Sequence, residues 1–134
     1  MPILFLAEYT AIIFVLVLIS LFLKNRRLFF ISVLSLSSTW FLTRILEVLN
    51  FKFLHLLPKT FPSDHAALGF SLSVIVFSRY RIWGVVLLAL AMLMSWARVI
   101  AGFHYYIDIT GGIALGVIVS LLILAWLKDR TAPS

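Results

Sequence analysis

The chain has 134 residues, of which 63% are hydrophobic and 12% charged, and it contains no cysteine. Soluble domains carry about half apolar and about a quarter charged residues, so this composition excludes an ordinary soluble globule and a disordered chain. The lack of cysteine excludes a disulfide framework and a thiol-ligated metal site. The formal net charge of +6 comes from short basic clusters between apolar runs, which argues against a nucleic-acid-binding surface.

Five apolar runs follow one another along the chain, separated by short polar segments. They cover residues 3–23, 28–50, 63–77, 82–97 and 109–127. Each run is close to the roughly 20 residues that cross a bilayer as a helix, and a helix satisfies its own backbone in lipid. The sequence therefore predicts an all-α integral-membrane bundle of about five transmembrane helices, with residues 1–134 forming a single domain.

The basic residues divide unevenly between the two ends of such a bundle. The end that carries the C-terminus holds seven of the eleven lysines and arginines: Lys24, Arg26, Arg27, Arg79, Arg81, Lys128 and Arg130. The other end holds the remaining four, Arg44, Lys52, Lys59 and Arg98, with all three histidines. By the positive-inside rule the more basic end faces the cytoplasm. We therefore expect a multi-pass protein of the plasma (inner) membrane, with its N-terminus and polar cluster outside and its C-terminus in the cytoplasm.

The connector after the second run leads into a segment that can bind an anion. Residues 59–65 read Lys-Thr-Phe-Pro-Ser-Asp-His, and Pro62 before Ser63 suits a helix start, with Ser63 or Asp64 as the N-cap. The first backbone N–H groups of that helix would face outward with the positive end of its dipole, where they can hold an anion. The alternative is structural: Ser63 and Asp64 cap the helix, and His65 lies at the membrane interface.

A second polar segment separates the fourth run from the fifth, and it carries Arg98, His104 and Asp108. The last two are four residues apart, so on a helix they share a face and the carboxylate can orient the imidazole. The other ring nitrogen then becomes a better nucleophile, and the Arg98 guanidinium matches phosphate oxygens. The alternative is an interfacial ion-pair network, with Tyr105 and Tyr106 at the level of the lipid headgroups.

Both segments fall at the same end of the predicted bundle. Together they bring two histidines, carboxylates, an arginine, lysines and a helix N-terminus to one membrane face. Ionisable groups held against membrane helices are costly and usually functional. Phosphoryl transfer needs such a set, because its catalysis is mostly positioning and charge stabilisation.

The two segments resemble signatures of the type 2 phosphatidic acid phosphatase family. Residues 98–108, Arg-x5-His-x3-Asp, look like the family's third signature, Ser-Arg-x5-His-x3-Asp. Residues 62–65, Pro-Ser-Asp-His, look like its second, Pro-Ser-Gly-His. With Asp in place of Gly, this segment is most similar to the subgroup that hydrolyses undecaprenyl diphosphate. The resemblance covers about residues 44–116, the core of the expected domain.

The chain departs from the family pattern in three ways. The first signature, Lys-x6-Arg-Pro, has its best literal fit in Lys52-x6-Lys59-Thr60, so a lysine stands where the family has a forked guanidinium. Arg44, one helix end away, is the other candidate for that cation. The family's serine directly before Arg98 is absent. Family members commonly have six spans, whereas five are expected here, so a first helix is expected to be missing.

The resemblance implies a role for each matching residue. His104 would attack the phosphorus and form a phosphohistidine, Asp108 would hold its ring, and His65 would protonate the leaving oxygen and then help to activate water. The phosphoryl oxygens would be bound by the other polar residues of the three signatures: Arg98, Lys59, Lys52, Ser63 and Asp64. The family needs no metal or other cofactor, and one carboxylate pair without cysteine is a poor metal site.

These features predict a metal-independent lipid phosphatase that acts in the bilayer, most simply on undecaprenyl diphosphate, in the recycling of a cell-wall lipid carrier. The expected partners are the lipid phosphate and the membrane, and no nucleic acid. One alternative is the same mechanism on phosphatidylglycerophosphate or phosphatidic acid. The altered first signature leaves a catalytically inactive scaffold open. An anion transporter is the third alternative, although charges at helix ends and the lack of an internal repeat argue against it.

Small residues recur at intervals of four in two of the runs. Gly112-x3-Gly116 lies in the last run and Gly69-x3-Ser73 in the third. Such spacing allows two membrane helices to approach closely, so we expect both pairs to be packing features.

Overall fold

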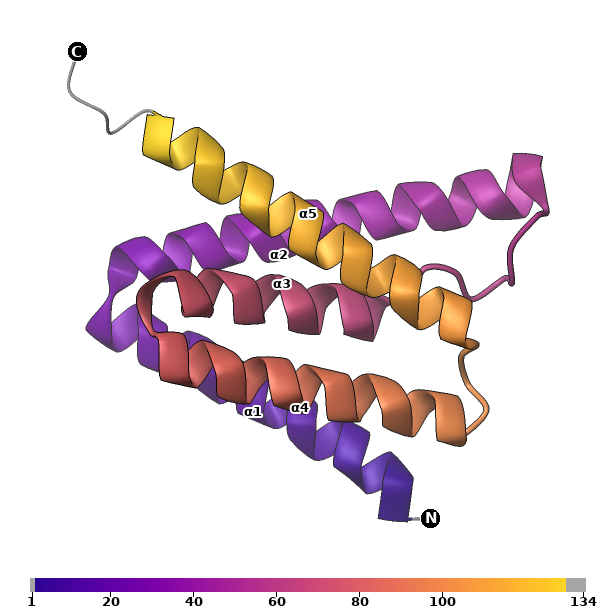
Figure 1. The fold of residues 1–134 in the computed structure, drawn as a ribbon, viewed down its shortest axis with the longest axis horizontal. Helices are drawn as coiled ribbons and strands as arrows, with labels where there is room; N and C mark the ends of the chain where they lie inside the picture. The colour runs from indigo at the N-terminus through magenta and orange to yellow at the C-terminus, as the bar shows by residue number, and fades with distance from the viewer. Residues whose placement is uncertain (1, 130–134) are drawn as a thin grey trace.

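The computed structural model describes residues 2–129, which form five antiparallel α-helices (Figure 1). The helices are α1 (Pro2–Lys24), α2 (Arg26–Leu49), α3 (Asp64–Arg79), α4 (Arg81–Ile100) and α5 (Tyr106–Asp129). At its end α2 widens into a π-helical turn, Asn50–Leu54. The prediction of an all-α bundle is confirmed, and Arg130, which was counted at the basic end, lies outside the described residues.

Three helical stretches of the described chain are long and apolar enough to cross a membrane: Arg26–Phe53, Arg81–Ile100 and Tyr106–Lys128. The chain is therefore a multi-pass membrane protein. A shorter apolar stretch of α1 runs over Ile12–Lys24. α3 has only 16 residues, about 24 Å at 1.5 Å per residue, which is less than the roughly 30 Å of a hydrocarbon core.

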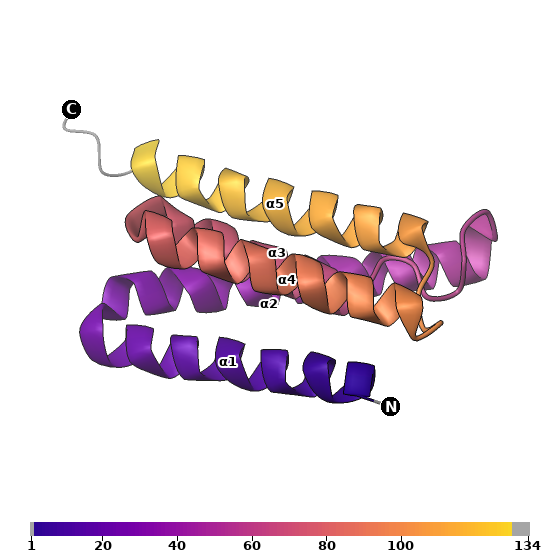
Figure 2. The ribbon, with the colours of Figure 1, turned by 60° about the horizontal axis from the view of Figure 1, so that its bottom comes forward.

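α3 lies in the middle of the bundle, whereas α1 and α5 cover opposite faces (Figure 2). Every residue of α3 from Gly69 to Ser73 is buried. A Cβ on Gly116 of α5 would lie 2.2 Å from the carbonyl oxygen of Ala67, and one on Gly112 would lie 2.5 Å from that of Ser63. The expected packing at Gly112 and Gly116 is confirmed, because the backbone of α5 rests directly on that of α3. Gly69 of the other pair packs against α4, where an added Cβ would lie 3.1 Å from the Cβ of Ala91.

A cluster of buried hydroxyl groups joins α2, α3 and α5 at mid-bundle. The Ser35 hydroxyl lies 2.9 Å from that of Ser71 and 3.0 Å from that of Ser120, and Thr39 donates to the Ser71 hydroxyl at 3.2 Å. Hydrogen bonds between membrane helices contribute about 0.6 kcal/mol each on average. The cluster therefore holds the three helices in one register with modest but directional bonds.

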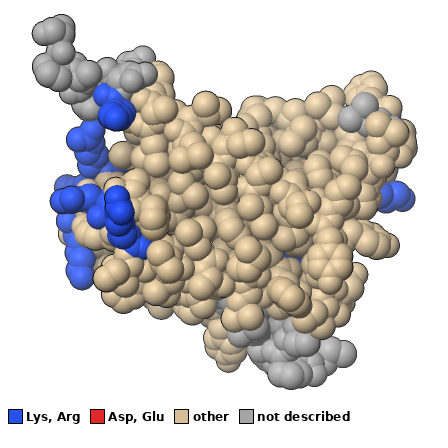
Figure 3. All heavy atoms as spheres, viewed as in Figure 1, with Lys and Arg blue, Asp and Glu red and all other residues tan. Residues whose placement is uncertain are grey.

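The two ends of the bundle differ in charge. Lysines and arginines gather at the end where α1 meets α2, α3 meets α4, and α5 finishes (Figure 3). The opposite end brings together the finish of α2, the start of α3, the finish of α4 and the start of α5 (Figure 1). All residues of the two signature segments lie at this second end.

Candidate active site

α3 begins after Ser63, which is its N-cap and one of the two N-cap candidates that the sequence offers. Its side-chain oxygen accepts the backbone N–H of Ala66 at 3.5 Å, and Ser63 itself is fully buried. An N-cap of this kind satisfies one of the free N–H groups of the first helical turn. Asp64 and His65 follow in that turn, so their side chains emerge at the positive end of the α3 dipole.

The end of α4 is shaped by Gly102, which has a positive φ of 76°. The N–H of Gly102 donates to the carbonyl of Val99 at 3.0 Å, and that of Phe103 donates to the carbonyl of Arg98 at 3.1 Å. This pair of bonds is the Schellman motif, which glycine ends most readily because it tolerates the left-handed conformation. The turn brings His104 back toward the bundle within one short loop of Arg98.

The connector between α2 and α3 is folded against the end of α2. The Asn50 side chain donates to the carbonyls of Leu57 and Pro58 at 3.1 and 3.0 Å, and its oxygen accepts the N–H of Leu57 at 3.1 Å. Asn50 is only 3% exposed. These three bonds fix where the connector leaves α2, and hence where Thr60 and Ser63 arrive.

Two hydrogen bonds join the connector to the first turn of α5. The Thr60 hydroxyl donates to Oδ2 of Asp108 at 2.6 Å, and the backbone N–H of Ser63 donates to the Asp108 carbonyl at 3.0 Å. The Pro-Ser-Asp-His segment and the Arg-x5-His-x3-Asp segment are therefore in direct contact. Thr60 was not singled out as a site residue from the sequence, where it only marked a departure from the family signature.

Asp108 is the fully buried anchor of this end of the bundle. Its Oδ2 accepts the Tyr105 N–H at 2.9 Å, as the carboxylate of a capping box does at the start of a helix. The same oxygen lies 3.4 Å from Nδ1 of His104. The histidine and the carboxylate meet, as expected. The expected shared helix face is wrong, however, because His104 lies in the loop before α5 and only Asp108 is on the helix.

His65 and Arg98 form the second half of the cluster. Nη2 of Arg98 lies 2.8 Å from Nε2 of His65. A guanidinium has no acceptor atom, so in this contact Arg98 donates and Nε2 of His65 accepts. The His65 ring is then neutral, with its proton on Nδ1.

Four buried polar atoms of the cluster lack a hydrogen-bond partner within the described chain. They are Oδ1 of Asp64, Nε of Arg98, Nδ1 of His104 and Oδ1 of Asp108. Native proteins leave few buried polar groups unpaired. Their concentration here marks this end of the bundle as a buried polar site, in which Nε of Arg98 is a donor that can bind an anion and the two carboxylate oxygens can only accept.

Arg44 is the cation that the structure brings to this cluster from α2. Its Nη2 pairs with Oδ2 of Asp64, and its Nη1 lies 2.6 Å from Oε2 of Glu47. The two lysines of the expected first signature are placed differently. Lys59 lies over the Phe51 ring, 5.9 Å from its centroid, and Lys52 is exposed on the π-helical turn.

Neither lysine forms a hydrogen bond or ion pair with the histidines in the part of the chain that the structure describes, so their phosphate-binding roles stay predictions. So do those of Ser63 and Asp64. Over the same residues, no group of three or more histidine or acidic side chains is placed to hold a metal ion. The independence from metals expected from the sequence likewise remains a prediction.

The sequence profile described as the PAP2 superfamily matches residues 39–132. YbjG of Escherichia coli (strain K12), provisionally named an undecaprenyl-diphosphatase, is 35% identical over 74 residues, 54% of this chain and 37% of the relative. The bacitracin transport permease protein BcrC of Bacillus licheniformis is 37% identical over 79 residues, 59% of this chain and 36% of the relative.

The undecaprenyl-diphosphatase BcrC of Bacillus subtilis (strain 168) is 29% identical over 68 residues, 51% of this chain and 35% of the relative. The matched regions thus span about a third of the length of these curated relatives. No solved structure matches the chain significantly.

Proposed function

The chain belongs to the PAP2 superfamily, and from this we propose that it is a membrane phosphatase that removes the terminal phosphate of a lipid diphosphate. The matched residues, 39–132, contain every residue of the polar cluster described above: Arg44, Thr60, Ser63, Asp64, His65, Arg98, His104 and Asp108. Two of the relatives carry undecaprenyl-diphosphatase in their names. Undecaprenyl diphosphate is therefore the proposed substrate, and undecaprenyl monophosphate and inorganic phosphate are the proposed products.

One observation carries the proposal: two segments far apart in sequence meet through the bonds of Thr60 and Ser63 to Asp108 and of Arg98 to His65. This contact gathers a candidate nucleophile, a carboxylate beside it, a second histidine and a guanidinium at one end of a membrane bundle. Phosphoryl transfer depends on such positioning and on cationic stabilisation of the phosphoryl oxygens. The isoprenoid tail would remain in the bilayer beside the helices.

In the first proposed step, His104 is the nucleophile. Its Nδ1 lies 3.4 Å from Asp108, so the carboxylate can hold the proton on Nδ1 and leave the Nε2 lone pair free. Nε2 attacks the terminal phosphorus and the bond from phosphorus to the bridging oxygen breaks. His65 protonates that oxygen, and undecaprenyl monophosphate leaves.

In the second proposed step, water attacks the phosphohistidine. His65 takes a proton from this water, the bond between phosphorus and Nε2 of His104 breaks, and inorganic phosphate leaves. Because the resting His65 ring is neutral, His65 becomes an acid only after its Nε2 is released from Arg98 and takes up a proton from the solvent. The proton that His65 later takes from the attacking water restores this protonated ring for the next turnover. We propose that the substrate's anionic oxygens draw the Arg98 guanidinium onto themselves, because such charge-assisted pairs are stronger than a bond to a neutral ring.

We also propose that the basic end of the bundle faces the cytoplasm and that the polar cluster faces the opposite side of the inner membrane. The support is the separation of charge seen in Figure 3 and the positive-inside rule. With this orientation, the enzyme would act on a lipid diphosphate exposed at the outer leaflet.

The test is the release of inorganic phosphate from undecaprenyl diphosphate in detergent micelles, with a metal chelator present. We expect His104→Asn to lower kcat at least about 10³-fold, as the loss of a catalytic histidine does elsewhere. His55→Asn is the matched control, because His55 is exposed on the connector and its positive φ of 50° suits asparagine. Equal turnover by the folded His104 variant and wild type would refute the mechanism.

The same assay separates the alternative functions. Preferential turnover of phosphatidylglycerophosphate or phosphatidic acid would keep the chemistry and change the substrate. Binding of lipid diphosphates without hydrolysis by the folded wild-type protein would instead identify an inactive scaffold.

A further inference from the structure

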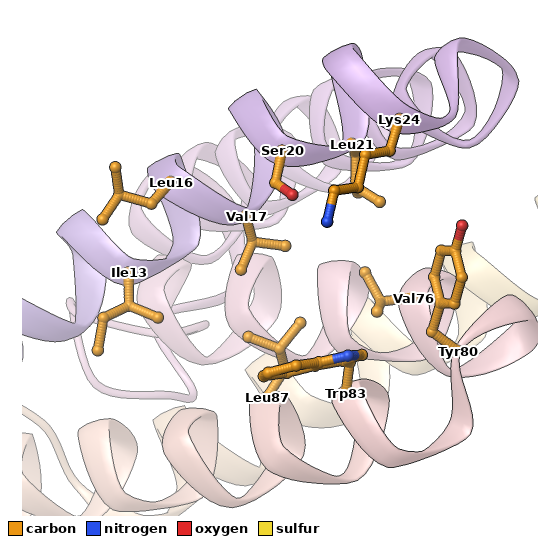
Figure 4. Close-up of a pocket in the computed structure, with 10 residues that line it drawn as sticks. All are labelled: Ile13, Leu16, Val17, Ser20, Leu21, Lys24, Val76, Tyr80, Trp83 and Leu87. Carbon is orange, nitrogen blue, oxygen red and sulfur yellow. The ribbon is translucent and has the colours of Figure 1, made fainter.

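A pocket of about 360 Å³ lies at the end of the bundle opposite the polar cluster, between α1 on one side and α3 and α4 on the other (Figure 4). Its volume falls within the range of small-molecule and cofactor sites, roughly 300 to 1,000 Å³. No residue of the proposed phosphatase site lines it. It therefore requires an explanation of its own.

The pocket is an apolar slot between the helices, with a buried floor and an exposed rim. Its floor is formed by Leu21, Val76 and Leu87, which are 6%, 2% and 2% exposed. Its rim is formed by Leu16 and Trp83, which are 58% and 66% exposed. A buried apolar floor with an exposed apolar rim on membrane helices suits an acyl chain better than a polar, water-soluble ligand.

One end of the slot is polar and cationic. Lys24 and Tyr80 both line it there, and the Lys24 side chain reaches from α1 into the space facing α3 and α4 (Figure 4). The guanidinium of Arg79 lies over the Tyr80 ring, 6.0 Å from its centroid. All the charged groups that line or adjoin this slot among the described side chains are positive, so an occupant with an anionic head is favoured.

We infer that this slot binds one acidic glycerophospholipid from the leaflet at the basic end of the bundle. An acyl chain lies along the apolar floor, and the phosphate is held by the Lys24 ammonium, with Arg79 nearby. The charge decides the occupant: a zwitterionic lipid would present its own cation to the same basic cluster. Because the slot is remote from His65 and His104, this inference is independent of the proposed phosphatase activity.

Trp83 on the rim provides the measurement, because bromine atoms on a lipid chain quench a tryptophan that they contact. The working variant carries Trp40→Phe, Trp96→Phe and Trp126→Phe, so that Trp83 is the reporter. The protein is placed in phosphatidylcholine vesicles that contain an equal minor fraction of either brominated phosphatidylglycerol or brominated phosphatidylcholine. We expect phosphatidylglycerol to be enriched about fivefold at Trp83, the effect of one lysine contact.

Two controls decide between a specific site and general attraction to a basic surface. A variant that keeps Trp126 as its single tryptophan reports on the same end of the bundle from α5, outside the slot. Lys24→Gln removes the charge, whereas Lys24→Arg keeps it. The inference predicts a preference for phosphatidylglycerol at Trp83 that exceeds that at Trp126, disappears with Gln and persists with Arg.

Equal preference at the two tryptophans, or an unchanged preference in Lys24→Gln, would overturn the inference. Leu16→Phe gives a second check, because it narrows the slot from the exposed rim and leaves Lys24 in place. It should reduce the quenching of Trp83 by brominated phosphatidylglycerol. Equal quenching with Leu16 and with Phe at this position would contradict an acyl chain bound in the slot.

Discussion

Replacing Thr60 by valine removes one hydroxyl from the candidate site and keeps a side chain of the same shape. That hydroxyl donates to Oδ2 of Asp108 at 2.6 Å, and the Tyr105 N–H donates to the same atom at 2.9 Å. The other carboxylate oxygen, Oδ1, is buried without a partner in the described chain. Without counting His104, the fully buried carboxylate has two donors in the wild type, and the substitution leaves it with one, the Tyr105 N–H.

The size of the effect follows from the charge and exposure of the two groups. A hydrogen bond to a charged group contributes about 1.5 to 3 kcal/mol. Thr60 is exposed, so water can replace part of its bond and the lower value applies. About 1.4 kcal/mol corresponds to a tenfold change in rate. We therefore expect Thr60→Val to lower kcat about tenfold through weaker support of His104 by Asp108, with little change in KM.

The assay is steady-state phosphate release from undecaprenyl diphosphate, with kcat and KM determined separately. Thr60→Ser keeps the hydroxyl and should remain close to wild type. Thr110→Val is the matched control, because Thr110 is exposed and its hydroxyl donates to the Ile107 carbonyl within its own helix. The reasoning fails if the valine variant keeps wild-type kcat, or if serine is as damaging as valine.

Three further predictions test other parts of the molecule. Gly116→Leu should destabilise the bundle by at least about 1 to 3 kcal/mol by overpacking, since even a Cβ there would lie 2.2 Å from the Ala67 carbonyl oxygen; a thermal unfolding midpoint equal to wild type would contradict this close contact. If Arg44 supplies the cation that the first signature lacks, Arg44→Gln should lower kcat/KM about tenfold or more, whereas Lys52→Gln should change it less than about threefold. A larger loss in Lys52→Gln than in Arg44→Gln would assign the binding of the phosphoryl oxygens to Lys52 instead. In this cysteine-free chain, Lys52→Cys should react with an impermeant thiol reagent in intact cells and Arg79→Cys should not, and labelling in the opposite sense would invert the proposed orientation.

The helices could be predicted from the sequence because run length and hydropathy are sufficient to identify them in a membrane. Their ends were less accessible. The expected fourth run stopped at residue 97, but α4 continues to Ile100, because a terminal arginine can extend its head to the interface without breaking the helix. The true stop signal is Gly102, whose positive φ ends the helix.

The π-helical turn Asn50–Leu54 could not be predicted. Its residues read Asn-Phe-Lys-Phe-Leu, a pattern that does not distinguish an α-turn from a wider one. Its consequence is large, because the turn presents Asn50 to the connector through three hydrogen bonds. Those bonds depend on the fold of the connector itself, which hydrophobic periodicity does not describe.

The pairing within the site was predictable only where the residues are close in sequence. His104 and Asp108 were expected to meet, and they do, although the loop geometry differs from the expected helix face. The contacts of Thr60 with Asp108 and of Arg98 with His65 join residues 48 and 33 positions apart. The first contact depends on how α5 packs on α3 through Gly112 and Gly116, and the second on how α4 packs on α3, where Gly69 meets Ala91. Spacing alone specifies neither.

One departure from the family signatures bears on another. Asp64 stands where the family's second signature has glycine, and a lysine stands where its first signature has arginine. Asp64 directly precedes His65 in the chain. In the structure the Asp64 carboxylate pairs with Arg44 of α2. A glycine at position 64 could not make this bond. We therefore propose that Asp64 holds the Arg44 guanidinium near the site and that an anionic substrate competes with the carboxylate for it. In this proposal Arg44 of α2 supplies the forked cation that the connector lacks.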